Sequence, residues 1–213
     1  MKTIFLSLFS LFFLLNVQAQ TDSIQYISKL EIGKKKNKTF SSRDSSLNLT
    51  IDTLIMNDRS RLIFYGKKNV KLKVNHAVIG KDAFIFGTDG KNNGSDMDIA
   101  IRFEDLKSLT VSAAGLDAHN GTRTFPNGNG GNVTLKYLAD GVTPQQKDKK
   151  GTAYLSIDTE AGGYSVNAQS DVRNILSQIG RGSRPLGGLP RGQIYSGSPG
   201  VDGKSEVTAV NEF

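Results

Sequence analysis

The chain has 213 residues, contains no cysteine or tryptophan, and carries a formal net charge of +7. The lack of cysteine excludes disulfides, thiolate metal ligands and a cysteine nucleophile. The length allows one domain with a core of its own, and the positive charge favours contact with polyanions.

Residues 1–19 have the features of a cleavable secretory signal peptide. Lys2 is followed by an apolar run from Ile4 to Leu15, which is long enough for a signal peptide and too short to cross a bilayer. Val17-Gln18-Ala19 then places small residues two positions apart, in the pattern that a signal peptidase accepts. We therefore expect an exported protein without a transmembrane span, in the periplasm, at the outer membrane or outside the cell. Export without disulfides favours a bacterial envelope.

A polar lead-in segment, residues 20–46, is expected to contribute one strand near Ile27 to Ile32. From Leu47 onward apolar residues recur at every second position, which is the pattern of half-buried strands. Gly, Asn or Asp bounds most of these runs, so the domain is expected to be all-β. The expected strands are Leu47–Ile51, Val70–Val74, Phe84–Phe86, Ile99–Phe103, Leu109–Ala113, Val133–Tyr137 and Ala153–Ile157.

The strands start at intervals that suggest a repeat. One series, at Leu62, Phe84, Leu109, Val133 and Ala153, advances by 20 to 25 residues, and a second starts at Leu47, Val70 and Ile99. Two short strands per repeat are typical of a short parallel β-helix, or β-solenoid, in which each coil buries its inner face on the next. An antiparallel β-sandwich is the alternative, because both folds alternate inward and outward residues. The solenoid domain is expected over residues 47–168.

Glycine distinguishes two later regions. Between Gly115 and Gly131, several glycines and asparagines predict a long loop with positive φ at several positions. A short helix is expected over residues 169–180 because its apolar residues share one face. The Gly/Pro-rich tail, residues 181–213, has few large side chains, so an extended polyproline-like or polyglycine-like backbone is expected there.

Two motifs lie in these glycine-rich regions. They are Asn129-Gly130-Gly131-Asn132-Val133 and Gly197-Ser198-Pro199-Gly200-Val201-Asp202-Gly203. Together with the signal peptide and the Asn- and Lys-rich strands, they give a sequence that resembles exported glycine-rich, collagen-like or β-helical proteins of Bacteroidota. The resemblance implies a lineage and a compartment rather than an activity.

Three patterns of chemical interest have weak support. Gly203-Lys204-Ser205 lacks the glycine spacing and the flanking elements of a phosphate-binding loop. Asp117 and His119 share a loop, but no serine lies in a nucleophile-elbow sequence. A third pattern offers oxygen ligands for calcium, although its spacing departs from known calcium loops and also fits a solvated turn. Its residues are Asp89, Asn92, Asn93, Asp96 and Asp98.

Four lysines form the candidate binding site. Lys67, Lys71 and Lys73 share strand parity, and Lys136 is expected on a neighbouring coil, so together they predict a polyanion-binding strip. A solvated face is the alternative. No cofactor, metal site or catalytic residue is assigned, and nucleic acid is not an expected partner of an exported chain.

The function expected from the sequence is that of an exported, non-enzymatic structural or interaction protein of a bacterial envelope. Its partner would be an envelope protein complex or an anionic glycan, and a solenoid end offers a site for self-association. The alternative function is a carbohydrate-active protein that binds or cleaves an anionic polysaccharide, which would need convergent carboxylates and a basic residue on an outer sheet face.

Overall fold

The computed structural model describes residues 24–118, 125–163 and 199–213. Within these ranges the named secondary-structure elements are all β-strands. The odd-numbered strands are β1 (Ile24–Ile32), β3 (Ser46–Met56), β5 (Asn69–Ile79), β7 (Asp96–Leu106), β9 (Val133–Leu138) and β11 (Ser205–Val210). The even-numbered strands are β2 (Asn37–Phe40), β4 (Arg61–Tyr65), β6 (Ala83–Thr88), β8 (Ser108–Ser112) and β10 (Tyr154–Asp158).

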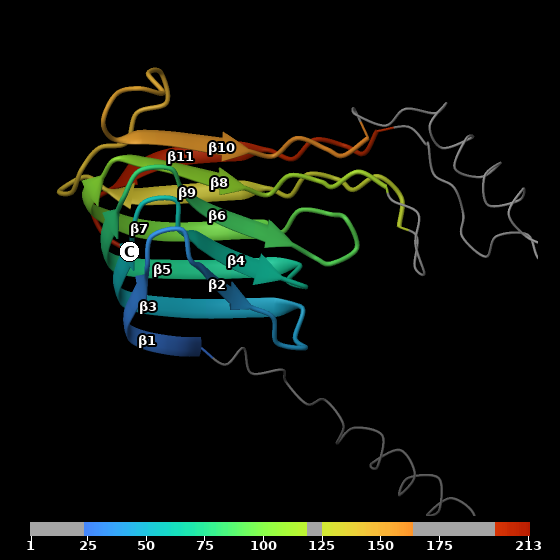
Figure 1. The fold of residues 1–213 in the computed structure, drawn as a ribbon, viewed down its shortest axis with the longest axis horizontal. Helices are drawn as coiled ribbons and strands as arrows, with labels where there is room; N and C mark the ends of the chain where they lie inside the picture. The colour runs from blue at the N-terminus through green and yellow to red at the C-terminus, as the bar shows by residue number, and fades with distance from the viewer. Residues whose placement is uncertain (1–23, 119–124, 164–198) are drawn as a thin grey trace, which may run out of the picture.

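The odd and even strands form two separate sheets. One is six-stranded, in the order β1-β3-β5-β7-β9-β11, and the other is five-stranded, in the order β10-β8-β6-β4-β2 (Figure 1). The backbone therefore passes from one sheet to the other and back in each coil. Every pairing between named strands is parallel. The fold is the expected β-solenoid, and the antiparallel sandwich is excluded.

The strand at Val133 belongs to a different series from the one that its spacing suggested. It starts β9 in the six-stranded sheet, next to β7, whereas Leu62, Phe84 and Leu109 lie in the five-stranded sheet. The residues between β8 and β9 make this coil longer than the others. Strands that are evenly spaced in the sequence therefore do not all fall in the same sheet.

The solenoid begins earlier and ends later than residues 47–168. The segment expected as a polar lead-in contributes both β1 and β2, and the end of the segment expected as a tail forms β11. Lys38 and Thr39 of β2 are exposed, so the hydrophobic alternation that reveals interior strands is weak at this end of the molecule. Stacking of the Phe40 and Phe64 rings, with centroids 5.9 Å apart, joins β2 to the core. The expected helix over 169–180 lies outside the described residues.

The long strands turn a corner partway along their length. In β3, Asp52 and Thr53 lie next to each other between buried residues, and both are only partly buried. In β5 the corresponding pair is Asn75 and His76. Two successive outward positions break the two-residue alternation, so the buried face of each strand continues on the other side of a bend.

Beyond the strands, five glycine-containing segments pack backbone against backbone (Figure 1). We call residues 92–94, 113–116, 128–131, 159–162 and 200–203 the glycine bundle. One chain of hydrogen bonds passes through all five segments: the amide of Gly200 donates to Gly162 (3.0 Å), Gly162 to Gly128 (2.9 Å), Gly128 to Leu116 (2.9 Å) and Leu116 to Asn92 (2.7 Å). The expected polyglycine-like backbone of the tail is therefore packed against other segments at residues 200–203.

Close approach explains why these segments need glycine. A Cβ atom at Gly128 would lie 1.7 Å from the carbonyl oxygen of Asn92, and one at Gly94 would lie 1.7 Å from that of Ala113. Among the described glycines, positive φ occurs at Gly66, Gly90 and Gly163 and not between 115 and 131. The prediction of positive φ in that region was therefore wrong for the glycines described there, because backbone packing is what excludes a side chain.

Candidate functional site

A groove of about 520 Å³ crosses the outer face of the six-stranded sheet, near the start of β3, β5, β7 and β9. We call it the strand-start groove. Outward positions two residues apart on each strand supply two rows of polar side chains to its lining. The ladder row is Ser46, Asn69, Asp96 and Asn132, and the open row is Asn48, Lys71, Asp98 and Thr134.

Side chains of the ladder row bind one another and the backbone. Asn69 donates to the Ser46 hydroxyl at 3.5 Å, and Asp96 Oδ1 accepts from the backbone and side-chain nitrogens of Asn132 at 2.9 and 3.0 Å. The Asn132 side-chain oxygen in turn accepts from the Lys204 amide at 3.0 Å. These bonds make the ladder row a fixed wall of the groove.

The side chains of the open row differ from those of the ladder row in their hydrogen bonding. Its four members are direct register partners across the sheet. In the described part of the chain, none of the four side chains has a hydrogen-bond or ion-pair partner. Lys71 and Asp98 are exposed, while Asn48 and Thr134 are partly buried. The row therefore presents free donors and acceptors to the groove.

The structure separates one of the four lysines of the predicted strip from the other three. Lys67 is fully buried, and its ammonium group donates to the Ser42 hydroxyl and to the carbonyls of Ser42 and Asp44. Lys73 donates to a Phe213 oxygen at 2.8 Å and lies 5.3 Å from the centre of the Phe213 ring. Lys71 is opposite Asp98, and Lys136 is exposed on β9. Lys67 is therefore separated from the strip, whereas Lys71, Lys73 and Lys136 lie at outward positions of the six-stranded sheet, and Ala100 is the register partner of both Lys73 and Lys136.

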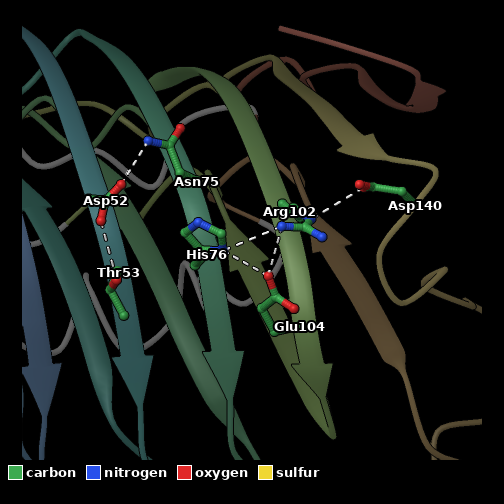
Figure 2. A network of polar contacts seen from close by, with 7 residues as sticks. All are labelled: Asp52, Thr53, Asn75, His76, Arg102, Glu104 and Asp140. Carbon is green, nitrogen blue, oxygen red and sulfur yellow. Dashed lines mark hydrogen bonds and ion pairs between the residues drawn. The ribbon is translucent and has the colours of Figure 1, made fainter.

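A second polar group lies where the long strands turn their corner (Figure 2). We call His76, Arg102, Glu104 and Asp140 the corner cluster. Glu104 Oε1 is 2.8 Å from His76 Nδ1 and 3.0 Å from Arg102 Nη1, and Arg102 Nε is 3.3 Å from Asp140 Oδ1. Because Nδ1 of His76 donates to Glu104, it cannot also accept from Arg102, so their 3.5 Å approach is a contact only.

The hydrogen bond from His76 is the main reason that the pKa of Glu104 lies below its ordinary value of 4.5. The nearby Arg102 guanidinium lowers the pKa further, and partial desolvation opposes both effects. Glu104 is thus held as a carboxylate between two basic groups. Each carboxylate of the corner cluster has a basic partner, which is the pattern of an ion-pair network that stabilises the corner.

The corner cluster could not be predicted from the sequence, because its members are far apart along the chain. His76 and Glu104 are 28 residues apart, and register between β5 and β7 shifts near the corner. The open row was missed for a related reason: Asp98 was considered only as a calcium ligand and Lys71 only as part of the lysine strip, and neither Asn48 nor Thr134 was singled out as a binding residue. The signal that could have connected the four residues of the open row is that each occupies an outward strand position in neighbouring repeats.

The residues of the calcium pattern do not converge. Asp89 accepts from the amides of Lys91 and Asn93 at 2.7 and 3.1 Å, which closes a local turn. Asn92 instead donates to the Pro126 carbonyl at 3.0 Å, and Asp96 belongs to the ladder row. Within the described ranges no three acidic or histidine side chains form a group that could hold a metal ion.

The pairing of Asp117 with His119 lies partly outside the described residues, because His119 is not among them. Asp117 itself accepts from the Gly163 amide at 2.6 Å, next to the glycine bundle. No helix in the described residues is long and apolar enough to cross a membrane.

No family model, curated protein or solved structure matches this chain. Its function must therefore be inferred from its own surfaces.

Proposed function

We propose that this chain is exported and acts as a non-enzymatic structural or interaction protein of a bacterial envelope, presenting a rigid β surface to a protein or glycan partner. The observation that supports this most directly is the in-register open row, held on a sheet whose interior strands are hydrogen-bonded on both sides. Backbone ladders of this kind fix the spacing of outward side chains, so a partner meets a preformed surface.

The proposal of export rests on residues 1–19, and that of a bacterial envelope on export without cysteine. The alternative, cleavage or binding of an anionic polysaccharide, has less support. The clustered carboxylates of the corner cluster are each paired with Arg102 or His76, and Lys67 of the predicted lysine strip is buried.

Capture of partners from the envelope fraction of the source organism tests the proposal. The tagged chain is expressed with its own N-terminal segment, and bound molecules are identified after washing at about 0.1 M and about 1 M salt, which shortens the Debye length from ~10 Å to ~3 Å. An unrelated protein matched to the sequence pI of about 9.5 is the control. We expect a partner that the control does not retain at high salt. Retention of the same molecules by both baits, or recovery of the chain from the cytoplasm, would contradict the proposal.

Self-association through a solenoid end is part of this proposal. The inward positions of the first coil include Gln25 and Lys38, opposite Leu49 and Leu62, and polar inward residues discourage pairing of a sheet edge. The inward positions of β11 are Ser205, Val207 and Ala209, none of which is charged, and Val207 is the largest apolar side chain among them. We therefore expect any pairing to use β11, and light scattering should show that Val207→Lys lowers the molar mass of a self-associated form. A self-associated form unaffected by this change would place the contact elsewhere.

A further inference from the structure

We propose that the strand-start groove binds an uncharged or zwitterionic polysaccharide segment lying across the strands, with the open row hydrogen-bonding its hydroxyl groups and Tyr26 packing on a sugar ring. The inference rests on the proposed function and names the partner class of that surface. It requires a preformed polar groove, unused hydrogen-bonding capacity, a lining without net positive charge, and an apolar contact near one end.

The open row supplies the hydrogen-bonding capacity. Lys71 offers only donors, Asp98 only acceptors, and Asn48 and Thr134 offer both. Neighbouring strands in a sheet are about 4.8 Å apart, so these groups repeat along the groove at roughly that spacing. A polysaccharide carries hydroxyl groups that both donate and accept along its whole length, and it can therefore satisfy each member of such a mixed row.

Charge in the groove argues against a polyanion. Lys71 is the single basic side chain in the lining, and it faces Asp98 in register, with Asp96 in the adjacent row. An anionic polymer attracted to Lys71 would meet both carboxylates at close range, where like charges repel. An uncharged or zwitterionic chain avoids that repulsion and can bind Lys71 and Asp98 together.

The direction of the groove argues against a peptide. It crosses β3, β5, β7 and β9, whose backbone groups already pair with strands on either side. Peptides that bind sheets commonly add a strand at a free edge and gain backbone hydrogen bonds there. A ligand in this groove must be recognised through side chains, as the open row allows.

An apolar contact lies at the β1 end of the same face. Ile24 is the register partner of Asn48, and Tyr26 is that of Thr50. Their side chains are 66% and 63% exposed, which is high for large apolar residues. A tyrosine ring with a free polar tip can pack against the C–H face of a sugar while its hydroxyl stays in water. Tyr26 does not line the groove itself, but it lies on the same face of the sheet, one strand beyond Asn48 and Thr50, where a chain that extends out of the groove can place a sugar ring on it.

Binding of the full-length chain, secreted from an expression host, to immobilised polysaccharides tests the inference. The panel contains uncharged chains (dextran, a β-glucan, a glucomannan), a zwitterionic chain and anionic chains (alginate, polygalacturonate, heparin), each at about 0.1 M and about 1 M salt. We expect binding to an uncharged or zwitterionic chain, and binding to an uncharged chain should change less than about twofold between the two salt concentrations, because it involves no ion pair that salt can screen. Tyr26→Ala and Asp98→Ala should each weaken it about tenfold, a change of about 1.4 kcal/mol.

Lys136→Ala is the matched control, because Lys136 is an exposed lysine on the same sheet outside the groove lining. Thermal unfolding of each variant confirms that the fold is intact. Binding to anionic chains only, loss of binding to an uncharged chain at high salt, equal effects of Lys136→Ala and Asp98→Ala, or no binding to any uncharged or zwitterionic chain would overturn the inference. The polysaccharide inference can fail while the proposed function holds. This is the case if no polysaccharide binds as expected but the chain and its Tyr26 and Asp98 variants still capture an envelope protein at high salt.

Discussion

Lys67 is a residue whose environment in the structure differs from the one that the sequence suggested. Its parity with Lys71 and Lys73 suggested an exposed strip, yet its side chain is fully buried and binds oxygen atoms of Ser42 and Asp44. The buried ammonium group joins the segment after β2 to the next coil. A buried cation with several acceptors holds a loop in place, and its removal leaves those acceptors without a donor.

Replacing Lys67 with methionine, which has similar length and no charge, should destabilise the fold by about 1–3 kcal/mol because the carbonyls of Ser42 and Asp44 lose the donor that the buried lysine provides. Chemical unfolding measures the free-energy difference. Lys71→Met is the control, since Lys71 is exposed and has no partner in the described residues. Equal stability of the two variants would show that the contacts of Lys67 contribute little.

At the corner cluster, acid should reveal the contribution of Glu104. Its pKa in the folded protein lies below the ordinary 4.5, so the carboxylate favours folding above that pH, and the contribution is lost as the pH falls through the lower folded pKa. We expect the wild type to melt at a higher temperature than Glu104→Gln at about pH 5.5, and the gap to close near pH 2–3. A gap of constant size across this range would mean that ionisation of Glu104 is not its source.

At the scale of elements, the glycine bundle is the feature whose sequence signal was seen and misread. Glycines and asparagines between 115 and 131 indicated irregular backbone, and residues 115–118 and 125–131, the described parts of this segment, form no strand. The physical reason is proximity: segments from separate coils approach so closely that a Cβ atom would overlap a carbonyl oxygen. The partners of each glycine lie in other segments, which no local pattern can reveal.

Gly128→Ala should destabilise the protein by about 1–3 kcal/mol, because the new Cβ would lie 1.7 Å from the Asn92 oxygen and force the segments apart. Thermal unfolding provides the measurement. Gly33→Ala is the matched control, since its Cβ would lie 3.5 Å from the Lys36 side chain, at ordinary contact distance. Similar melting temperatures for the two variants would contradict close packing in the glycine bundle.

For the molecule as a whole, stability should depend on how many neighbours a coil has. A solenoid is held together by contacts between adjacent coils, so interior positions are covered on both sides and end positions on one. Leu135 on β9 and Val207 on β11 occupy the same inward row, and Leu135 is fully buried whereas Val207 is only partly buried. This pair allows a direct comparison.

Leu135→Ala should cost about 2–5 kcal/mol, as for other fully buried leucines. Val207→Ala should cost about 1 kcal/mol, because it removes two methyl groups that are already partly exposed. Urea denaturation of both variants measures the difference. Equal losses would indicate that β11 is covered as completely as β9, which would require a partner at this end of the solenoid.

The sequence by itself determined the all-β class and favoured a parallel solenoid, because two-residue alternation and a repeat of 20 to 25 residues are local properties. The strand pairings of the tertiary structure excluded the antiparallel sandwich, which the same alternation also allows. The sequence located the interior strands and one strand near Ile27 to Ile32, which is part of β1, but not the end strands β2 and β11. End strands are covered on one side only, so their apolar pattern is weaker. Only the tertiary structure decided which outward residues become neighbours: it buried Lys67, brought His76 to Glu104, and aligned Asn48, Lys71, Asp98 and Thr134 in one row. Register between strands depends on the length and packing of each coil, and a surface site in a solenoid is a property of that register.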